Sequence, residues 1–292
     1  MFIMNKMCIK YLVYTVSALL PVLAARNPCR AQYYYKDIVV TAQISAGYQL
    51  LKANKVTAVH VNPSADRDMP SREGVSIGQT IFPAQNLVVT YTKTPENGES
   101  WLKAYYNPGG ALITTVDSTN DMVTRAVYTY DAAGRISAIS SNSVPKNDPA
   151  QTETHLWYYN ATGKPSRMVK IKNGSDTTYA AYEPDEKGNP GEEKVTRYRV
   201  SLGSTYYYYD DKNRLTDVAR YSKKADRILP EYMFEYNDAD QLSQMIIVPE
   251  GTSDYQTWKY SYNANGLKQQ EVCYNREKQL LGKVEYSYET GR

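Results

Sequence analysis

The chain has 292 residues, of which 42% are hydrophobic and 22% are charged, a balance that excludes an intrinsically disordered chain and a membrane-embedded helix bundle. Its aromatic residues are strongly biased, with 29 Tyr against 3 Phe and 3 Trp. Because a tyrosine keeps a hydroxyl that needs water or a hydrogen-bond partner, this bias indicates half-wetted sheet faces rather than one thick apolar core. Two His and three Cys leave little material for metal or thiol chemistry, so neither a metal nor a cofactor is expected.

The first 31 residues have the pattern of a secretory signal peptide. Lys6 and Lys10 precede a largely apolar run over residues 11–25. This run is shorter than the roughly 20 apolar residues that cross a membrane, so an integral membrane protein is not expected. Cleavage is expected after Ala24 or after Ala31, and the second site is favoured because a strand-like composition begins directly after it. An uncleaved N-terminal anchor is the alternative.

Loss of residues 1–31 changes the charge and the cysteine content. The segment holds four basic residues and no acidic one, which leaves 30 basic and 31 acidic residues in the exported part. Nucleic acid is therefore not an expected partner, because binding phosphates needs a concentrated positive face. Cleavage after Ala31 leaves Cys273 alone, which is unusual for an animal extracellular module. These features favour a bacterial protein that is periplasmic, secreted or on the cell surface.

Residues 32–100 are predicted to form a β-rich capping segment at the first edge of a sheet. In chain order, we expect a strand at residues 33–40, a short helix at 43–54 and a strand at 55–61. A polar loop at residues 62–74 and a hairpin formed by residues 87–92 and 101–105 follow. A separate small domain is the alternative interpretation of this segment.

Residues 101–292 are predicted to hold about eight copies of a repeat. In each copy a Tyr is followed by an acidic or amide residue and then by a Gly or polar turn, with 23 to 29 residues between successive anchors. The anchors are Tyr106, Tyr130, Tyr159, Tyr182, Tyr209, Tyr236, Tyr262 and Tyr288.

Each repeat is predicted to be one β-hairpin. Alternating residues such as 127–130 place aromatic side chains on one face, and the Asn, Asp and Gly positions suit tight reversals of the chain. One hairpin is not stable alone in water, so the copies are expected to pair edge to edge into an antiparallel sheet. The tyrosines are interpreted mainly as cross-strand contacts that hold the sheet together, with ligand binding as the alternative.

Two copies carry a family resemblance. Residues 130–136 (YDAAGRI) resemble the YD repeat of bacterial RHS-type proteins, whose units follow the pattern Y-D-x-x-G-R-L, and residues 209–215 (YDDKNRL) match with Asn in place of Gly. The copies at Tyr159 and Tyr262 depart in the basic–aliphatic pair. The resemblance covers roughly residues 100–292 and implies an exported β-sheet protein, of a kind that often binds carbohydrate or encases a toxin.

The predicted fold is therefore all-β: an antiparallel sheet of consecutive hairpin repeats, open or curled, with a β-rich N-terminal cap. Eight hairpins are too few to close a shell, so a toxin-encasing role is not expected.

Motifs of catalysis are missing from the sequence. It has no G-x-S-x-G nucleophile motif, no phosphate-binding glycine loop and no H-E-x-x-H zinc helix. His60 and His155 are expected to face solvent from strands, and Cys273 is expected to be a buried or half-buried strand residue. Acidic pairs fall in predicted turns, where Asp is favoured for backbone reasons.

We therefore expect a non-enzymatic exported protein, a structural or binding module whose partner is a polysaccharide or an envelope protein. An envelope protein could be reached through an exposed strand edge. Sugar rings could stack on aromatic side chains of the repeat strands. The candidate ligand-binding residues are Trp157, Tyr158, Tyr207, Trp258 and Tyr260. The alternative is an exported enzyme, such as a glycan-acting hydrolase, with its site in the N-terminal third.

Overall fold

The computed structural model describes residues 33–64, 75–95, 97–223, 225–249, 252 and 254–291, and the predicted signal peptide lies outside them. Within these residues it has one long helix, α2 (Lys36–Ala53), and eighteen β-strands. The strands are β1 (Val56–Ser64), β2 (Ser76–Phe82), β3 (Leu87–Thr94), β4 (Gly98–Tyr106), β5 (Leu112–Thr119), β6 (Met122–Tyr130), β7 (Ile136–Pro145), β8 (Gln151–Tyr159), β9 (Pro165–Lys172), β10 (Asp176–Pro184), β11 (Pro190–Arg197), β12 (Val200–Tyr209), β13 (Leu215–Ser222), β14 (Arg227–Tyr236), β15 (Leu242–Ile247), β16 (Gln256–Tyr262), β17 (Lys268–Tyr274) and β18 (Leu280–Thr290).

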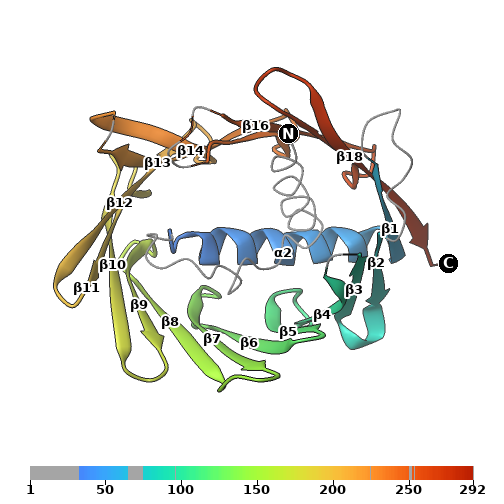
Figure 1. Cartoon of the computed structure of the whole chain (residues 1–292), viewed down its shortest axis with the longest axis horizontal. Coiled ribbons are helices and arrows are strands. Elements are labelled where there is room, and N and C mark those ends of the chain that lie inside the picture. The colour runs from blue at the N-terminus through green and yellow to red at the C-terminus, as the bar shows by residue number, and fades with distance from the viewer. Residues whose placement is uncertain are drawn as a thin grey trace.

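The eighteen strands form one closed antiparallel barrel (Figure 1). Each strand pairs with the next along the chain, and β1 also pairs with β18, where Val59 lies opposite Tyr288. The predicted antiparallel β architecture is confirmed, but the expected open or curled sheet is wrong. The segment expected to cap an edge instead supplies β1, β2 and β3. These three strands fill the gap between β18 and β4 that the repeat strands alone would leave.

Helix α2 lies inside the ring of strands (Figure 1). The strand predicted at residues 33–40 is wrong, because the helix begins at Lys36 and runs through most of the predicted helix at 43–54. Four consecutive β-branched residues at 38–41 favour a strand locally, but each described strand of the closed barrel already has a partner on both sides. Asp37 in the first turn and Lys52 in the last turn complement the helix dipole.

Alternation along each strand separates an inner face from an outer face. In β6, Thr124, Ala126 and Tyr128 are buried, whereas Val123 and Arg125 are exposed. Two large apolar clusters form on the inner face: one packs the C-terminal half of α2 against β1–β6 and β18, and the other packs the start of the helix against β7–β14. The helix therefore serves as the common core element for much of the barrel wall.

Eight hairpin turns share one backbone geometry. The first residue of each five-residue turn is Asn or Asp, and its side-chain oxygen accepts a hydrogen bond from the backbone N–H of the fifth. The fourth residue has a positive φ, and it is usually Gly because Gly adopts this conformation without steric cost. The turns begin at Asn107, Asp131, Asn160, Asp185, Asp210, Asn237, Asn263 and Asn275.

Six repeat tyrosines hold neighbouring hairpins together. Each hydroxyl donates a hydrogen bond, 2.5 to 2.9 Å long, to the backbone carbonyl of the residue that follows the preceding turn. The donors are Tyr130, Tyr159, Tyr209, Tyr236, Tyr262 and Tyr288. The structural interpretation of these residues is confirmed, although the hydroxyls bond to backbone rather than to other tyrosines. At two turns an arginine also lies over the next ring, as Arg214 lies 4.6 Å from the centroid of Tyr236.

The fourth copy departs from this pattern. The position directly before its turn is Pro184, which has no hydroxyl, and Tyr182 lies two residues earlier. Tyr182 instead donates its hydroxyl to the buried carboxylate of Glu193, 2.9 Å away. This departure occurs at β10 and β11, where the barrel wall contacts the start of α2.

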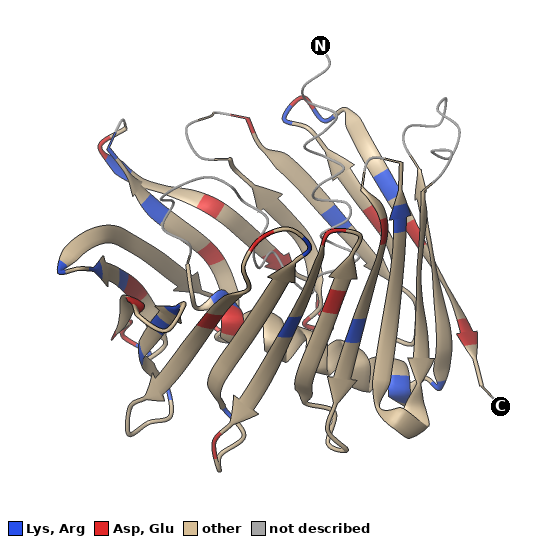
Figure 2. Ribbon diagram, turned by 60° about the horizontal axis from the view of Figure 1, so that its bottom comes forward, with Lys and Arg blue, Asp and Glu red and all other residues tan. Residues whose placement is uncertain are grey.

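Charged residues of both signs are scattered over the strands and turns of the wall (Figure 2). Solvent-exposed ion pairs on the outer face include Lys93–Glu99 at 3.1 Å and Lys194–Glu183 at 2.5 Å. In the part of the chain that the structure describes, no helix combines the length and apolar character needed to cross a bilayer.

Candidate functional site

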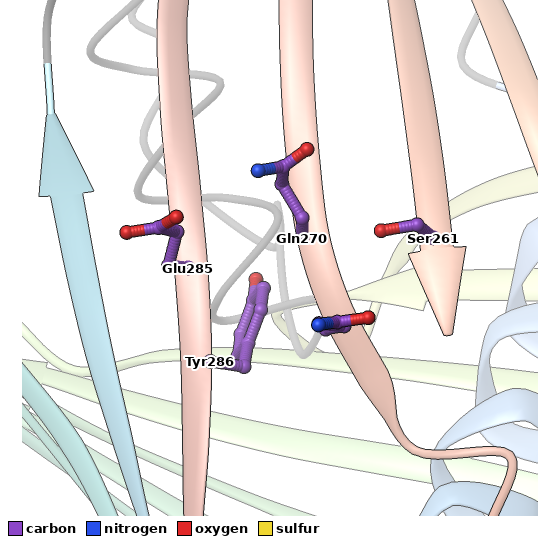
Figure 3. A pocket seen from close by; sticks show the side chains of 5 residues that line it. Ser261, Gln270, Glu285 and Tyr286 are labelled. Carbon is purple, nitrogen blue, oxygen red and sulfur yellow. The ribbon is translucent and has the colours of Figure 1, made fainter. Parts of the chain in front are cut away.

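A polar pocket of about 310 Å³ lies at the junction of β16, β17 and β18. Ser261, Gln270 and Glu285 project from the three neighbouring strands, and Tyr286 lies between β17 and β18 (Figure 3). Gln269 completes the lining. Ser261 and Glu285 are exposed, and the register places Ser261, Gln270 and Glu285 side by side in one row of the outer face.

The pocket opens because two strands part. The register between β17 and β18 runs from Tyr274 only as far as Gln270, which lies opposite Glu285. Gln269 has no partner in the register of either neighbour, since β16 skips it at a bulge. Beyond Glu285, β18 continues to pair with β1 alone. The gap between the two strands is occupied by the side chain of Tyr286 (Figure 3).

A buried carboxylate lies behind the pocket. Glu271 is completely buried, and its Oε1 accepts hydrogen bonds from Tyr286 at 2.8 Å and from Lys268 at 2.5 Å. Its Oε2 has no hydrogen-bond partner among the residues that the structure describes. Burial and the charge of Glu271 raise the pKa of Tyr286 well above its usual range, so its hydroxyl stays protonated and remains a donor.

The pocket has the chemistry to bind a neutral polyhydroxyl compound. Two amides, a carboxylate and a hydroxyl can donate to and accept from ligand hydroxyls, and a tyrosine ring provides an apolar surface. Across the described ranges of the chain, no group of three or more His, Cys, Asp or Glu side chains is arranged to hold a metal ion.

A second polar cluster joins the start of α2 to the barrel wall. His155 on β8 contacts Asp37 of the helix at 2.5 Å and Glu153 of its own strand at 3.0 Å. Glu153 in turn binds Lys170 of β9 at 2.8 Å. The expectation that His155 faces solvent is therefore wrong, because its strand position points inward beneath the helix.

The protonation states of this cluster favour a structural role. Burial alone would lower the pKa of His155, but Asp37 and Glu153 raise it to about 9. Burial alone would raise the pKa of Glu153, but hydrogen bonds from His155 and Lys170 lower it to about 2. The imidazole is thus a cation held between carboxylates at neutral pH, whereas a general base needs a pKa near the working pH.

Glu193 on β11 completes the attachment of the helix. Its carboxylate accepts the backbone N–H groups of Tyr34 at 3.0 Å and Tyr35 at 3.1 Å, and the hydroxyls of Tyr182 and Tyr207 at 2.9 and 2.8 Å. Burial raises the pKa of Glu193, and these hydrogen bonds oppose that rise. The carboxylate therefore satisfies backbone donors at the start of α2 that would otherwise be buried without partners.

The five candidate ligand-binding residues do not share one surface. Trp157 is buried and stacks on Tyr182 at 5.6 Å, and Tyr207 is buried against Glu193. Trp258 is completely buried beside Cys273, whose predicted burial is confirmed.

The other two lie on opposite faces. Tyr260 faces inward near Lys268, whereas Tyr158 is 40% exposed on the outer face, with Arg167 4.2 Å from its ring centroid. Sequence reasoning missed all five pocket residues. The available signal was the copy at Tyr262, which departs from the repeat pattern at Leu267 and Lys268, directly before the bulge at Gln269.

Comparisons with known proteins give only distant similarities. No protein-family model matches the chain, and no curated protein matches it. Among solved structures, the chain is similar to a Tc holotoxin pore of Photorhabdus luminescens (14% identity, TM-score 0.34), over 70% of this chain and 11% of the toxin chain. A porin-like protein from Bacteroides uniformis aligns over 80% of this chain and 98% of its own, with 10% identity and a TM-score of 0.31. A DUF1329 family protein from Desulfovibrio piger aligns over 85% and 94%, with 11% identity and a TM-score of 0.20.

The predicted resemblance to YD-repeat proteins is wrong. No family model supports it, and the strands close into a barrel rather than an open repeat sheet. The two motif copies at residues 130–136 and 209–215 are accounted for by local geometry. In each, the Asp caps the turn, the Arg pairs with that Asp, and the Tyr bonds to a backbone carbonyl.

Proposed function

We propose that this protein is an exported, non-enzymatic barrel that binds a glycan in the polar pocket between β16, β17 and β18. The observation that carries the proposal is the gap in the wall, where the exposed Gln269 and Glu285 and the half-buried Gln270 line a pocket beside Tyr286. Amide and carboxylate groups around an aromatic ring suit the alternating hydroxyl and C–H surfaces of a sugar.

The lack of an enzymatic role is supported by the state of the acid–base groups. The His, Asp and Glu side chains that meet at the start of α2 hydrogen-bond to one another and hold the helix. His155 is also locked as a cation by its two carboxylate partners. In the described part of the N-terminal third, Asp37 is bound to His155, and His60 is bound to Glu289.

Export is supported by the amino-acid pattern of residues 1–31, with two lysines before an apolar run. We place the protein in the envelope or the exterior of a bacterium. Binding of an envelope protein by strand addition is disfavoured, because each described strand of the closed barrel already has two neighbours.

The test is a binding screen of the purified protein against starch, xylan, mannan and pectin, read by isothermal titration calorimetry. We expect saturable binding of at least one polysaccharide, and a loss of about tenfold or more in affinity in the double variant Gln270→Ala/Glu285→Ala.

The matched control is Gln244→Ala/Glu235→Ala. Gln244 and Glu235 are also an amide and a carboxylate on neighbouring strands, and Nε2 of Gln244 donates to Oε1 of Glu235 at 2.8 Å. This pair lies outside the pocket. Equal loss in both double variants, or no binding of any polysaccharide by the wild-type protein, would overturn the proposal.

A further inference from the structure

We infer that Trp101 and Tyr91 form a second glycan contact on the outer face, so that the ligand is an extended polysaccharide chain rather than a single small sugar. This inference rests on the proposed function, because the same chain would run from the pocket to this aromatic pair. Its evidence is separate and comes from β1 to β4.

Trp101 differs from the other two tryptophans in its environment. Trp157 and Trp258 are buried in the barrel, at 4% and 0% exposure, whereas 44% of Trp101 is exposed. Its ring lies 4.5 Å from that of Tyr91 on the neighbouring strand, with 47° between the two planes. A solvent-facing indole gains little from core packing, and its apolar faces remain available for contact.

Polar groups surround this aromatic pair. On one side, Lys93 donates a hydrogen bond to the carboxylate of Glu99 at 3.1 Å. On the other side, Ser118 lies opposite Trp101 and donates its hydroxyl to the Trp101 carbonyl at 3.2 Å. A ring held in place between hydrogen-bonding groups is a suitable surface for stacking a sugar ring.

A glycine separates the aromatic pair from β1. The register runs across the outer face from His60 to Gly78, then to Tyr91 and to Trp101. Gly78 has no side chain, so this row is open between His60 and the aromatic pair. A ligand can therefore approach the edge of the Tyr91 ring along the surface.

The same surface leads to the pocket. Asn62 on β1 lies opposite Glu285 of the pocket, and His60, the next outer residue of β1, lies opposite Ser287. Four strand spacings separate β18 from β4, which corresponds to about 19 Å along the wall. A single small sugar does not bridge this distance, but a polysaccharide chain does.

The purely structural alternative is that Tyr91 and Trp101 are a cross-strand pair that only stabilises the sheet. Binding measurements with Trp101→Ala separate the two roles, with urea unfolding to confirm that the variant is folded. The probes are starch, xylan, mannan and pectin, and short and long oligosaccharides cut from whichever is bound. Tyr208→Ala is the control, since Tyr208 is 47% exposed on β12, away from this surface.

We expect Trp101→Ala to weaken polysaccharide binding about tenfold or more, and Tyr208→Ala to leave it unchanged. We also expect bound polysaccharide to protect wild-type tryptophan fluorescence from acrylamide quenching. Affinity should rise with oligosaccharide length in the wild-type protein and much less in Trp101→Ala.

The binding of the variants distinguishes failure of the aromatic contact from failure of the pocket. Unchanged binding by Trp101→Ala, with loss in Gln270→Ala/Glu285→Ala, overturns the aromatic contact and leaves the pocket as the site. Loss in Trp101→Ala alone supports the aromatic contact and removes the pocket from the proposed function. No binding of any probe by the wild-type protein overturns both.

Discussion

The carboxylate of Glu193 accepts the backbone N–H of Tyr34 with both of its oxygens, at 3.0 Å each, although 159 residues separate the two along the chain. This contact ties the middle of the barrel wall to the segment that leads into α2. The two tyrosine hydroxyls that also bind this carboxylate come from β10 and β12, on either side of it. Attachment of the internal helix therefore depends strongly on one buried acid.

Replacement of Glu193 by Gln should lower the free energy of unfolding by about 2–3 kcal/mol, because an amide nitrogen cannot accept from the N–H and O–H donors around it. Urea denaturation followed by circular dichroism measures the loss. Glu183→Gln is the control, since this exposed residue on β10 forms a surface ion pair with Lys194, and its effect should stay within about 0.5 kcal/mol. Equal effects of the two substitutions would contradict the assigned role of Glu193.

Stability should depend on pH through His155 and Glu153. The folded-state pKa of His155 is raised to about 9, so its contribution is complete below about 6.5 and is lost as the pH rises through 9. The pKa of Glu153 is lowered to about 2, so its contribution is present above about 4.5 and is lost as the pH falls through 2.

Unfolding free energies of the wild-type protein and of His155→Gln, measured from about pH 6 to about pH 10, check the alkaline arm. The difference between the two proteins should shrink as the pH rises. A difference that stays constant over this range would show that the charge of His155 does not stabilise the attachment of the helix.

Removal of one tyrosine hydroxyl from the repeat should cost about 1 kcal/mol. Tyr236→Phe deletes the hydrogen bond to the Leu215 carbonyl, 2.7 Å long, but keeps the ring beneath Arg214. Thermal and urea unfolding measure the change. Tyr208→Phe, on the outer face, should leave stability unchanged, and a similar loss there would argue against the interior hydrogen bonds.

The fourth turn position can be tested with a matched pair of substitutions. Gly134 has φ +76° with no atom near its missing side chain, so Gly134→Ala should cost about 1 kcal/mol through backbone strain alone. Lys278 is exposed and occupies the equivalent position of the last turn with φ 61°, so Lys278→Gly should be neutral or slightly stabilising. The free energy of unfolding of each variant is compared with that of the wild-type protein. A change in the same direction in both variants would contradict this account.

The hairpins were predictable from sequence because their signals are local. Asp131 and Gly134 mark a turn through a side-chain cap and a positive φ, both of which depend on only five residues. Whether a strand side chain faces the inside or the outside of the barrel was also predictable. Counting back in steps of two from Tyr159 places Trp157 inside, whereas the same count from Tyr106 leaves Trp101 outside. Our site prediction did not apply this parity and therefore selected the two buried tryptophans.

Closure of the sheet and the helix were not predictable in the same way. Closure depends on the total number of strands and their stagger, which no single repeat encodes. The β-branched run at residues 38–41 favours a strand locally, and it is overridden by distant partners such as Glu193 and His155. The pocket depends on a bulge at Gln269, whose existence is decided by how β17 meets both of its neighbours.

Pairing of β1 with β18 also sets the order of assembly. The two strands that complete the barrel are among the first and the last of the chain, and contacts between them, such as His60 with Glu289, span 229 residues. Hairpins can form as soon as their own residues are available, but the wall cannot close until the final strand has been delivered. The chain must therefore fold around α2 while a broad, unpaired edge is still open, and the period before closure is when it is most exposed to aggregation.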